Sequence, residues 1–173
     1  MIVTTYVRSE TQSLDDIKVY LEGRVFHVTK LEHLPSILKC GEIRANSDGK
    51  LPTTFGFSKN AYFRKRNCVS LFDYRAKPTD TIKRFREHCP PFSPASPNNP
   101  IAILILDPAA YNKLIPWTAK RNEDNAHGEM IVPNVETGYP GPLSLRLITE
   151  IIKVEINDNP NSLAALVRKA HKD

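Results

Sequence analysis

The stretch IAILILD, residues 101–107, decides the class of fold. Six apolar residues follow one another in it, with no alternation of polar and apolar side chains. A strand that has one face in water alternates, whereas a strand covered on both faces is apolar throughout. We therefore expect residues 101–107 to form a central strand of a sheet, packed on both faces.

Further strands and helices follow one another in a mixed order around this stretch. RVFHVT (24–29) and CVSLFDY (68–74) are rich in the β-branched and aromatic residues that favour strands. LEHLPSILKCG (31–41) and PTDTIKRFREHC (78–89) have helical patterns, and LRLITEIIKVEI (145–156) predicts a turn of helix running into a strand. This order predicts an α+β fold with a substantially antiparallel sheet.

The length of 173 residues fits a single domain over residues 1–173. Helices are expected near both ends, one opening at Ser13 and one over residues 161–172. The proline-rich stretch at 88–100 includes CPPFSPASPNNP, whose five prolines exclude regular structure. We expect a mobile loop insertion there.

Composition limits the class of protein and its partners. The net charge of +5 suits an anionic partner such as nucleic acid, although proteins that bind none share such a balance. No apolar run is long enough for a membrane span and no signal-peptide pattern opens the chain, so a cytoplasmic location is expected. Cys40, Cys68 and Cys89 are widely spaced, which disfavours a zinc site and disulfide bonds, so no metal is expected. Cys40 and Cys68 lie in apolar segments and are expected to be buried.

Three short motifs contain candidate functional residues. Strand alternation places His27 and Thr29 together on one face of VFHVT, where they either line a cleft or serve the structure. In HGEMIVP (127–133), Glu129 precedes a short apolar strand; it is either a solvated strand-end charge or a positioned acid.

The third motif is FGFSKNAYF (55–63). It is either a surface turn in which Ser58 caps a short helix, or a polar shelf for a nucleotide. In the second interpretation Ser58 and Asn60 supply polar groups, while Tyr62 or Phe63 stacks on a flat ring. The segment alone does not separate the two.

The order of these motifs resembles the ADP-ribosyltransferase superfamily, and most of all the DarT-type DNA ADP-ribosyltransferase toxins. HVTKLEHLPSILKCG is similar to that family's H-x-T strand and following helix of the form x-N-L-x-x-I-L-x-x-G. VSLFDYR resembles its V-x-F-Y-F-x-x-R strand, and GEMIVP its glutamate heading a short apolar strand. The resemblance spans residues 24–156.

The resemblance implies split antiparallel or mixed sheets that form an NAD cleft, with flanking helices. It implies an enzyme that moves ADP-ribose from NAD to a macromolecule, most often DNA, as a toxin or defence component with a possible antitoxin partner. Glu129 would stabilise the positive charge on the reacting ribose, and Arg75, with Arg44, would neutralise the pyrophosphate. The contacts to NAD would come from His27, from Thr29, from Arg44 and from the backbone of Val28. Ser58, Asn60, Tyr62 and Phe63 would complete the NAD site.

Several alternatives stay open. The second motif of the family could be the Arg75 strand or the Ser58 segment. Arg64, Lys65 and Arg66 are candidates for phosphate contacts to a nucleic-acid acceptor. The rival functions are an NAD-dependent RNA 2′-phosphotransferase, disfavoured by the lack of an evident second histidine near His27, and a non-catalytic module that binds nucleic acid or a protein.

Overall fold

The computed structural model describes residues 1–9, 12–55, 58–123 and 126–157. Regular strands and helices account for much of this part of the chain. The strands are β1 (Ile2–Ser9), β2 (Val25–Lys30), β3 (Glu42–Ile43), β4 (Cys68–Asp73), β5 (Ile101–Leu106), β6 (Ile115–Pro116), β7 (Glu136–Pro140), β8 (Leu143–Ser144) and β9 (Ile148–Asn157). The α-helices are α1 (Asp15–Leu21), α2 (Leu34–Cys40), α3 (Tyr62–Lys65) and α4 (Asp80–His88), and the 3-10 helices are η1 (Leu31–His33), η2 (Pro108–Lys113), η3 (Trp117–Asn122) and η4 (Leu145–Leu147).

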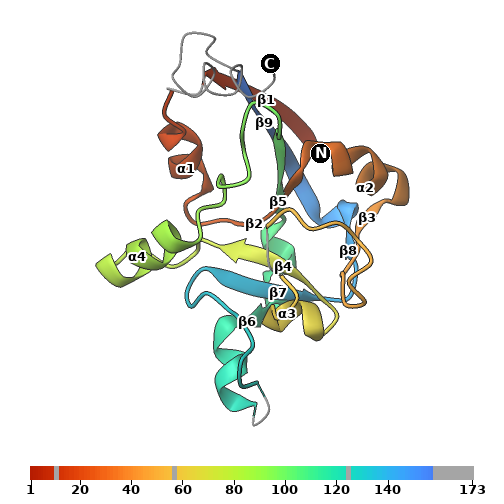
Figure 1. Cartoon of the computed structure of the whole chain (residues 1–173), viewed down its shortest axis with the longest axis vertical. Helices are drawn as coiled ribbons and strands as arrows, with labels where there is room; N and C mark the ends of the chain where they lie inside the picture. Colours follow the sequence, from red (N-terminus) through yellow and green to blue (C-terminus); the bar gives the residue numbers. More distant parts are fainter. Residues whose placement is uncertain (10–11, 56–57, 124–125, 158–173) are drawn as a thin grey trace, which may run out of the picture.

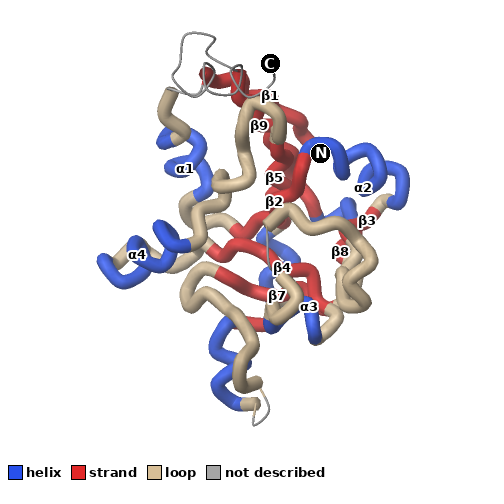
Figure 2. Tube along the Cα trace, viewed as in Figure 1, coloured by secondary structure: helices blue, strands red, loops and turns tan. Residues whose placement is uncertain are grey.

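The main sheet has seven strands in the order β1-β9-β5-β2-β4-β7-β6. Neighbouring strands pair antiparallel, except that β1 and β9 are parallel. A second sheet pairs β3 with β8. The expected α+β class with a largely antiparallel sheet is thereby confirmed, and Figures 1 and 2 show the helices around the sheet.

Strand β5 lies between β9 and β2, and all its residues are buried. Ile101, Ile103 and Ile105 pack into one core with residues of α1, whereas Ala102, Leu104 and Leu106 pack into another with Leu34 of α2. Both faces of β5 are therefore covered, as the unbroken apolar run predicts. Figure 1 shows α1 and α4 on one side of the molecule and α2 with the β3–β8 pair on the other.

The helix boundaries follow from local chemistry. Pro35 lies in the first turn of α2, where its missing N–H costs nothing, and Gly41 ends the helix at φ 73°. Thr79 caps α4 because its hydroxyl accepts the amide of Ile82. Both predicted helices are confirmed, as is the turn of helix that enters β9.

Strands β2 and β4 pair over a short distance only. Val25 faces Asp73 and Phe26 faces Phe72, and no further pair follows, although β2 pairs with β5 through five residues. Beyond Phe26 the two strands diverge, and β4 continues with β7 and β6 in a different direction (Figure 1). The widening gap between β2 and β4 is where the candidate site lies.

Three points differ from expectation. Glu129 does not begin a strand: Met130 forms an isolated bridge with Ala61, residues 133–135 form a turn in which Asn134 has φ 57°, and the strand β7 begins at Glu136. Cys40 is exposed, not buried. The strand β1 was not predicted, because its threonines and arginine interrupt the apolar pattern.

The proline-rich segment is irregular, as expected, but it is anchored. Phe92 is 8% exposed and packs into the core that contains α1 and β5. The expected terminal helix at 161–172 lies outside the described residues. Within those residues no helix is long and apolar enough to cross a membrane.

Candidate functional site

A pocket of about 410 Å³ lies in the gap between β2 and β4. Its walls come from β2, η1 and α2, the segment that follows β3, and parts of α3, β4 and β7. The volume is within the range of about 300–1,000 Å³ typical of small-molecule sites. Its polar lining includes His27, Thr29, His33, Arg44, Asn46, Ser58, Arg64, Ser70 and Glu136.

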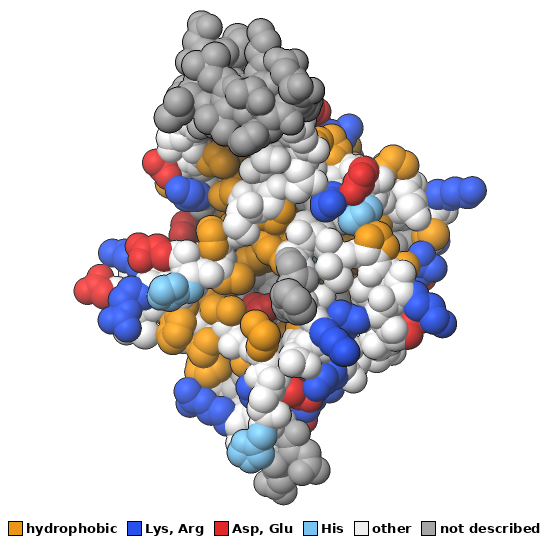
Figure 3. Space-filling model, in the orientation of Figure 1, with side chains coloured by type: hydrophobic (Ala, Val, Ile, Leu, Met, Phe, Trp, Pro, Cys, Tyr) orange, Lys and Arg blue, Asp and Glu red, His pale blue; other side chains and the backbone are white. Residues whose placement is uncertain are grey.

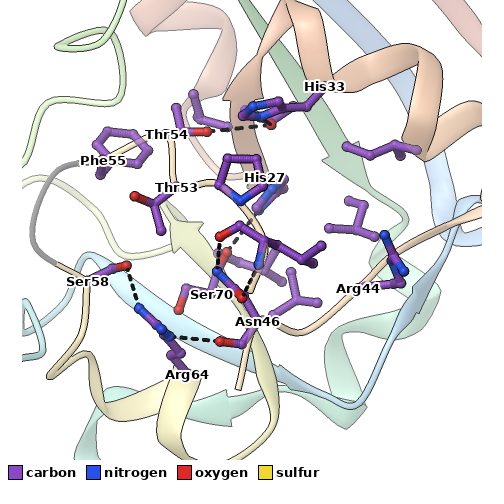
Figure 4. A pocket seen from close by; sticks show the side chains of 18 of the residues that line it. His27, His33, Arg44, Asn46, Thr53, Thr54, Phe55, Ser58, Arg64 and Ser70 are labelled. Carbon is purple, nitrogen blue, oxygen red and sulfur yellow. Dashed lines mark hydrogen bonds between the residues drawn. The ribbon is translucent and has the colours of Figure 1, made fainter. Parts of the chain in front are cut away.

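His27 bridges the gap between the diverging strands. Its Nδ1 lies 3.1 Å from the carbonyl oxygen of Ser70, which can only accept a hydrogen bond, so Nδ1 carries the proton. Burial lowers the pKa of His27, which the Ser70 carbonyl partly opposes. A neutral ring with Nδ1–H leaves Nε2 as an acceptor for a ligand hydroxyl (Figure 4).

Glu136 and Glu42 are half-buried carboxylates of this pocket. Burial raises the pKa of Glu136 above the ordinary value of 4.5, and the amide of Val132, which donates to Oε2 at 2.6 Å, opposes that rise. Glu136 begins β7 opposite Phe72, which stacks on Phe26 of β2. An acid with a raised pKa in a pocket with a histidine is typical of a reactive site.

Arg64 extends from α3 to the pocket and holds two segments together. Its Nε donates to the carbonyl of Asn46 at 2.7 Å and its Nη1 to the hydroxyl of Ser58 at 3.1 Å (Figure 4). Gly49, at φ +75°, leaves room for the guanidinium, because a Cβ there would lie well under 3.0 Å from Nη2. Arg64, a candidate for phosphate contacts to nucleic acid, therefore lines the pocket.

Two other basic groups line the same pocket. Arg44 is exposed, and neither Arg44 nor Arg64 forms an ion pair with a carboxylate among the described residues. His33 lies 3.2 Å from the hydroxyl of Thr29 through Nδ1. The pocket therefore offers two guanidinium groups to an anion, together with a second histidine that the sequence analysis missed.

Apolar surface completes the pocket. Phe55 and Phe72 both line it, with ring centroids 5.5 Å apart, and Val28 and Leu71 line it as well. Figure 3 shows hydrophobic side chains gathered near the centre of the face seen in Figure 1, with Lys and Arg side chains beside them at the lower right. A ligand with a flat ring and an anionic group would match both kinds of surface.

Glu129, the acid singled out in the sequence, does not line this pocket. Its carboxylate binds Arg66 at 2.5 Å and lies 3.5 Å from the ammonium group of Lys65, and its side chain is 9% exposed. It is neither a solvated charge nor a pocket acid but part of an ion-pair cluster. The expectation that it faces the cleft is wrong, because the chain turns between Glu129 and β7.

The residues of FGFSKNAYF separate into different environments. Tyr62 and Phe63 are each 1% exposed, so neither ring can stack on a ligand. Asn60 is exposed and does not line the pocket. Ser58 lines the pocket, but Ala61, not Ser58, occupies the N-cap of α3.

Arg75 and the basic run of α3 also differ from expectation. Asp73 binds the guanidinium of Arg75 through both carboxylate oxygens, at 2.8 and 2.6 Å, and Arg75 lines a separate pocket beside Trp117. Lys65 and Arg66 are engaged with acidic side chains rather than free for phosphate. Of the three basic residues expected to contact nucleic acid, all therefore have partners within the chain.

Of the expected cofactor residues, His27, Val28, Thr29, Arg44 and Ser58 do line one pocket. Glu136 was missed because a lone glutamate in VETGY resembles an exposed strand residue. The alternation of VETGY contained a signal, since Val135 and Thr137 are fully buried on either side of it. A glutamate between two buried residues can be placed in a pocket only when the neighbouring strands are known.

No group of three or more His, Cys, Asp or Glu side chains suited to a metal ion occurs within the described ranges. No family model, curated protein or solved structure matches this chain.

Proposed function

We propose that this protein is an NAD-dependent ADP-ribosyltransferase whose reacting acid is Glu136. The observation that carries the proposal is the joint presence in one pocket of a half-buried carboxylate with a raised pKa, a neutral histidine and two arginines without acidic partners among the described residues. The motif order that resembles the superfamily runs through the same strands, β2 and β4.

Each part of NAD has a matching group in the pocket. Pyrophosphate suits a guanidinium fork, and Arg64 is held with donors still available while Arg44 is exposed at the same pocket. A ribose hydroxyl can donate to Nε2 of His27. The aromatic nicotinamide suits the wall formed by Phe55 and Phe72.

The proposed chemistry breaks the bond between nicotinamide and C1′ of its ribose. The bonding electrons leave with nicotinamide, and positive charge develops on the ribose as in glycoside cleavage. The ionised carboxylate of Glu136 stabilises that charge and holds a ribose hydroxyl. The acceptor's oxygen or nitrogen then bonds to C1′, and its proton passes to a base such as the same carboxylate.

A macromolecular acceptor, most plausibly nucleic acid, is part of the proposal, since the chain carries a net charge of +5. Its contacts are assigned to no particular residues, because Lys65 and Arg66 are already paired within the chain. An antitoxin or other protein partner and a cytoplasmic location belong to the same proposal.

The deciding experiment incubates the protein with NAD labelled in its adenosine part, together with single-stranded DNA, duplex DNA, RNA or a cell lysate. We expect label to enter one acceptor fraction and nicotinamide to be released in equal amount. Nicotinamide release without labelled acceptor would limit the activity to hydrolysis. No release from any mixture, with NAD bound, would refute the transferase.

A second candidate, an NAD-dependent RNA 2′-phosphotransferase, gains support from one observation. Its weakness in the sequence analysis was the lack of a second histidine, but His33 lines the same pocket as His27, together with Arg44 and Arg64. These groups could hold a phosphate of the RNA. RNA bearing an internal 2′-phosphate separates the two enzymes: the rival removes that phosphate, whereas the transferase leaves it in place.

A further inference from the structure

We infer that Glu129 is a positioning residue: its ion pair with Arg66 holds the chain so that the Val132 amide meets the carboxylate of Glu136. The inference rests on the proposed function only in treating Glu136 as the reacting acid. The coupling between the two glutamates stands on contacts alone.

The first contact set fixes residues 129 and 130 to α3. Arg66 donates from Nη1 to Glu129 at 2.5 Å, and Lys120 donates to the Glu129 carbonyl. The next residue, Met130, donates to the Asn60 carbonyl at 2.8 Å and accepts from the amide of Tyr62 at 2.9 Å. Side chain and backbone are thus both attached at this point.

Arg66 is itself held rigidly. Its guanidinium lies 3.7 Å from the centre of the Tyr62 ring, and its Nε donates to Glu123 at 2.8 Å. The hydroxyl of Tyr62 donates to the same carboxylate at 2.6 Å. Because Tyr62 is 1% exposed, this stack ties Arg66 to the core. The Glu129 carboxylate therefore meets a guanidinium whose position is set independently of it.

The second contact set connects this anchor to the pocket. Three residues after Glu129, the Val132 amide donates to Oε2 of Glu136 at 2.6 Å, while the Val132 carbonyl accepts the amide of Glu136 at 3.1 Å. The side chain of Val132 packs at the edge of the core. Loss of the Glu129–Arg66 ion pair would leave the backbone bonds of Met130 in place and displace the Val132 amide only in part. A carboxylate whose N–H donor is displaced becomes a weaker acid.

Other titratable groups face Glu136 and act on it without involving Glu129. Cys89, after α4, is close enough for its pKa to be raised by the charge of Glu136 as well as by burial. The remaining titratable groups that line the pocket are His27 on β2, Glu32 and His33 on η1, Cys40 on α2, Glu42 on β3, Arg44, Arg64 on α3 and Cys68 on β4. Of these, Cys68 contacts the pair, because its Sγ donates to the Arg66 carbonyl at 3.4 Å.

The sign of the effect distinguishes positioning from plain electrostatics. Replacing Glu129 by Gln removes a negative charge, and that alone would lower the pKa of Glu136. Loss of the positioned amide raises it instead. Partial loss of this hydrogen bond to a charged group should weaken the Glu136 acid by about three- to tenfold.

The test is a carboxyl NMR titration of protein labelled with ¹³C at glutamate Cδ, without NAD. The Glu136 signal is assigned from Glu136→Gln. Glu129→Asp keeps the charge but shortens the reach to Arg66, whereas Glu129→Gln removes the charge. Each of these two variants should raise the pKa of Glu136. Glu32→Gln is the control: it removes a carboxylate that lines the pocket and pairs with Lys30, and it leaves Arg66 and residue 129 in place, so no rise is expected.

A Glu136 pKa that stays constant or falls in folded Glu129→Asp and Glu129→Gln would overturn the inference. If those variants do not fold, Arg66→Lys keeps the cation but loses the fork, and must raise the same pKa. Because the titration needs no turnover, its result is independent of whether the protein transfers ADP-ribose. If the protein turns over NAD, the pH at which turnover is lost on the acid side should rise by the same amount as the pKa of Glu136.

Discussion

Replacing Glu136 by Gln gives the sharpest test of the proposed active site. The amide keeps the size of the side chain, and its oxygen can still accept the Val132 N–H that Glu136 accepts at 2.6 Å. The turn before β7 is therefore retained, while the negative charge in the pocket is lost. If that charge stabilises the ribose cation, turnover should fall by about a hundredfold or more, roughly 2.7 kcal/mol.

The same substitution should stabilise the folded protein. Burial raises the pKa of Glu136 in the fold above 4.5, so ionising it costs folding free energy once the pH exceeds the unfolded value. Each tenfold change in the acid constant corresponds to about 1.4 kcal/mol. Urea unfolding at pH 7 should show Glu136→Gln more stable than wild type, and the difference should vanish below about pH 4, where both states bind the proton.

The assay pairs nicotinamide release with NAD affinity, measured on the same preparations. Glu32→Gln is the control, because Glu32 also lines the pocket but its side chain is 66% exposed and pairs with Lys30. We expect near-normal turnover from that control. Glu136→Gln turnover within about threefold of wild type, a barrier change under roughly 1 kcal/mol, would refute the assigned role.

Three further predictions follow from other contacts. Gly49→Ala should displace Arg64 and weaken NAD binding about tenfold or more, measured by calorimetry. Gly23→Ala is the control: with φ +76° and an open Cβ position, it should lower stability but leave NAD affinity unchanged. Gly138→Ala should destabilise by about 1–3 kcal/mol, since its Cβ would overlap the Phe63 ring, and Phe63→Leu should recover part of the loss in urea unfolding. Binding to a nucleic-acid acceptor should fall steeply between about 50 and 200 mM salt; a constant affinity would indicate a protein acceptor.

The placement of Arg64 shows how one arginine can differ from its neighbours in the same run. Within FRKRN, Lys65 and Arg66 contact acidic groups behind the pocket, whereas Arg64 reaches Asn46 and Ser58 at its front. A single helical turn presents successive side chains in different directions. A basic run therefore has no single function, and its members separate only when the helix is placed.

Stability and reactivity conflict at Glu136. A buried acid with a raised pKa is unfavourable for folding at neutral pH, and Gln would suit the same space. Groups of this kind are concentrated at sites of function, where charge must be available in a dry environment. A gain in stability together with a loss of turnover in Glu136→Gln is the result expected of such a group.

The sequence by itself determined the elements whose signals are local. The unbroken apolar run of 101–107 required a strand covered on both faces, and β5 is that strand. Pro35, Gly41 and Thr79 set helix boundaries through their own backbone chemistry, independent of any distant contact. Alternation along one strand placed His27 and Thr29 on the same face, and both line the pocket; Arg44, which lines it as well, was named through the family resemblance alone.

Only the tertiary structure decided which carboxylate belongs to the pocket. Glu129 and Glu136 are separated by a short turn, and each lies in a short stretch, GEMIVP or VETGYP, that could begin a strand, so no local signal ranks them. Their surroundings come from segments far away in the chain: Arg66 pairs with Glu129, whereas β4 and the diverging β2 place Glu136 beside the pocket. Burial and charge pairing are properties of assembled neighbours, and an acid's role depends on both.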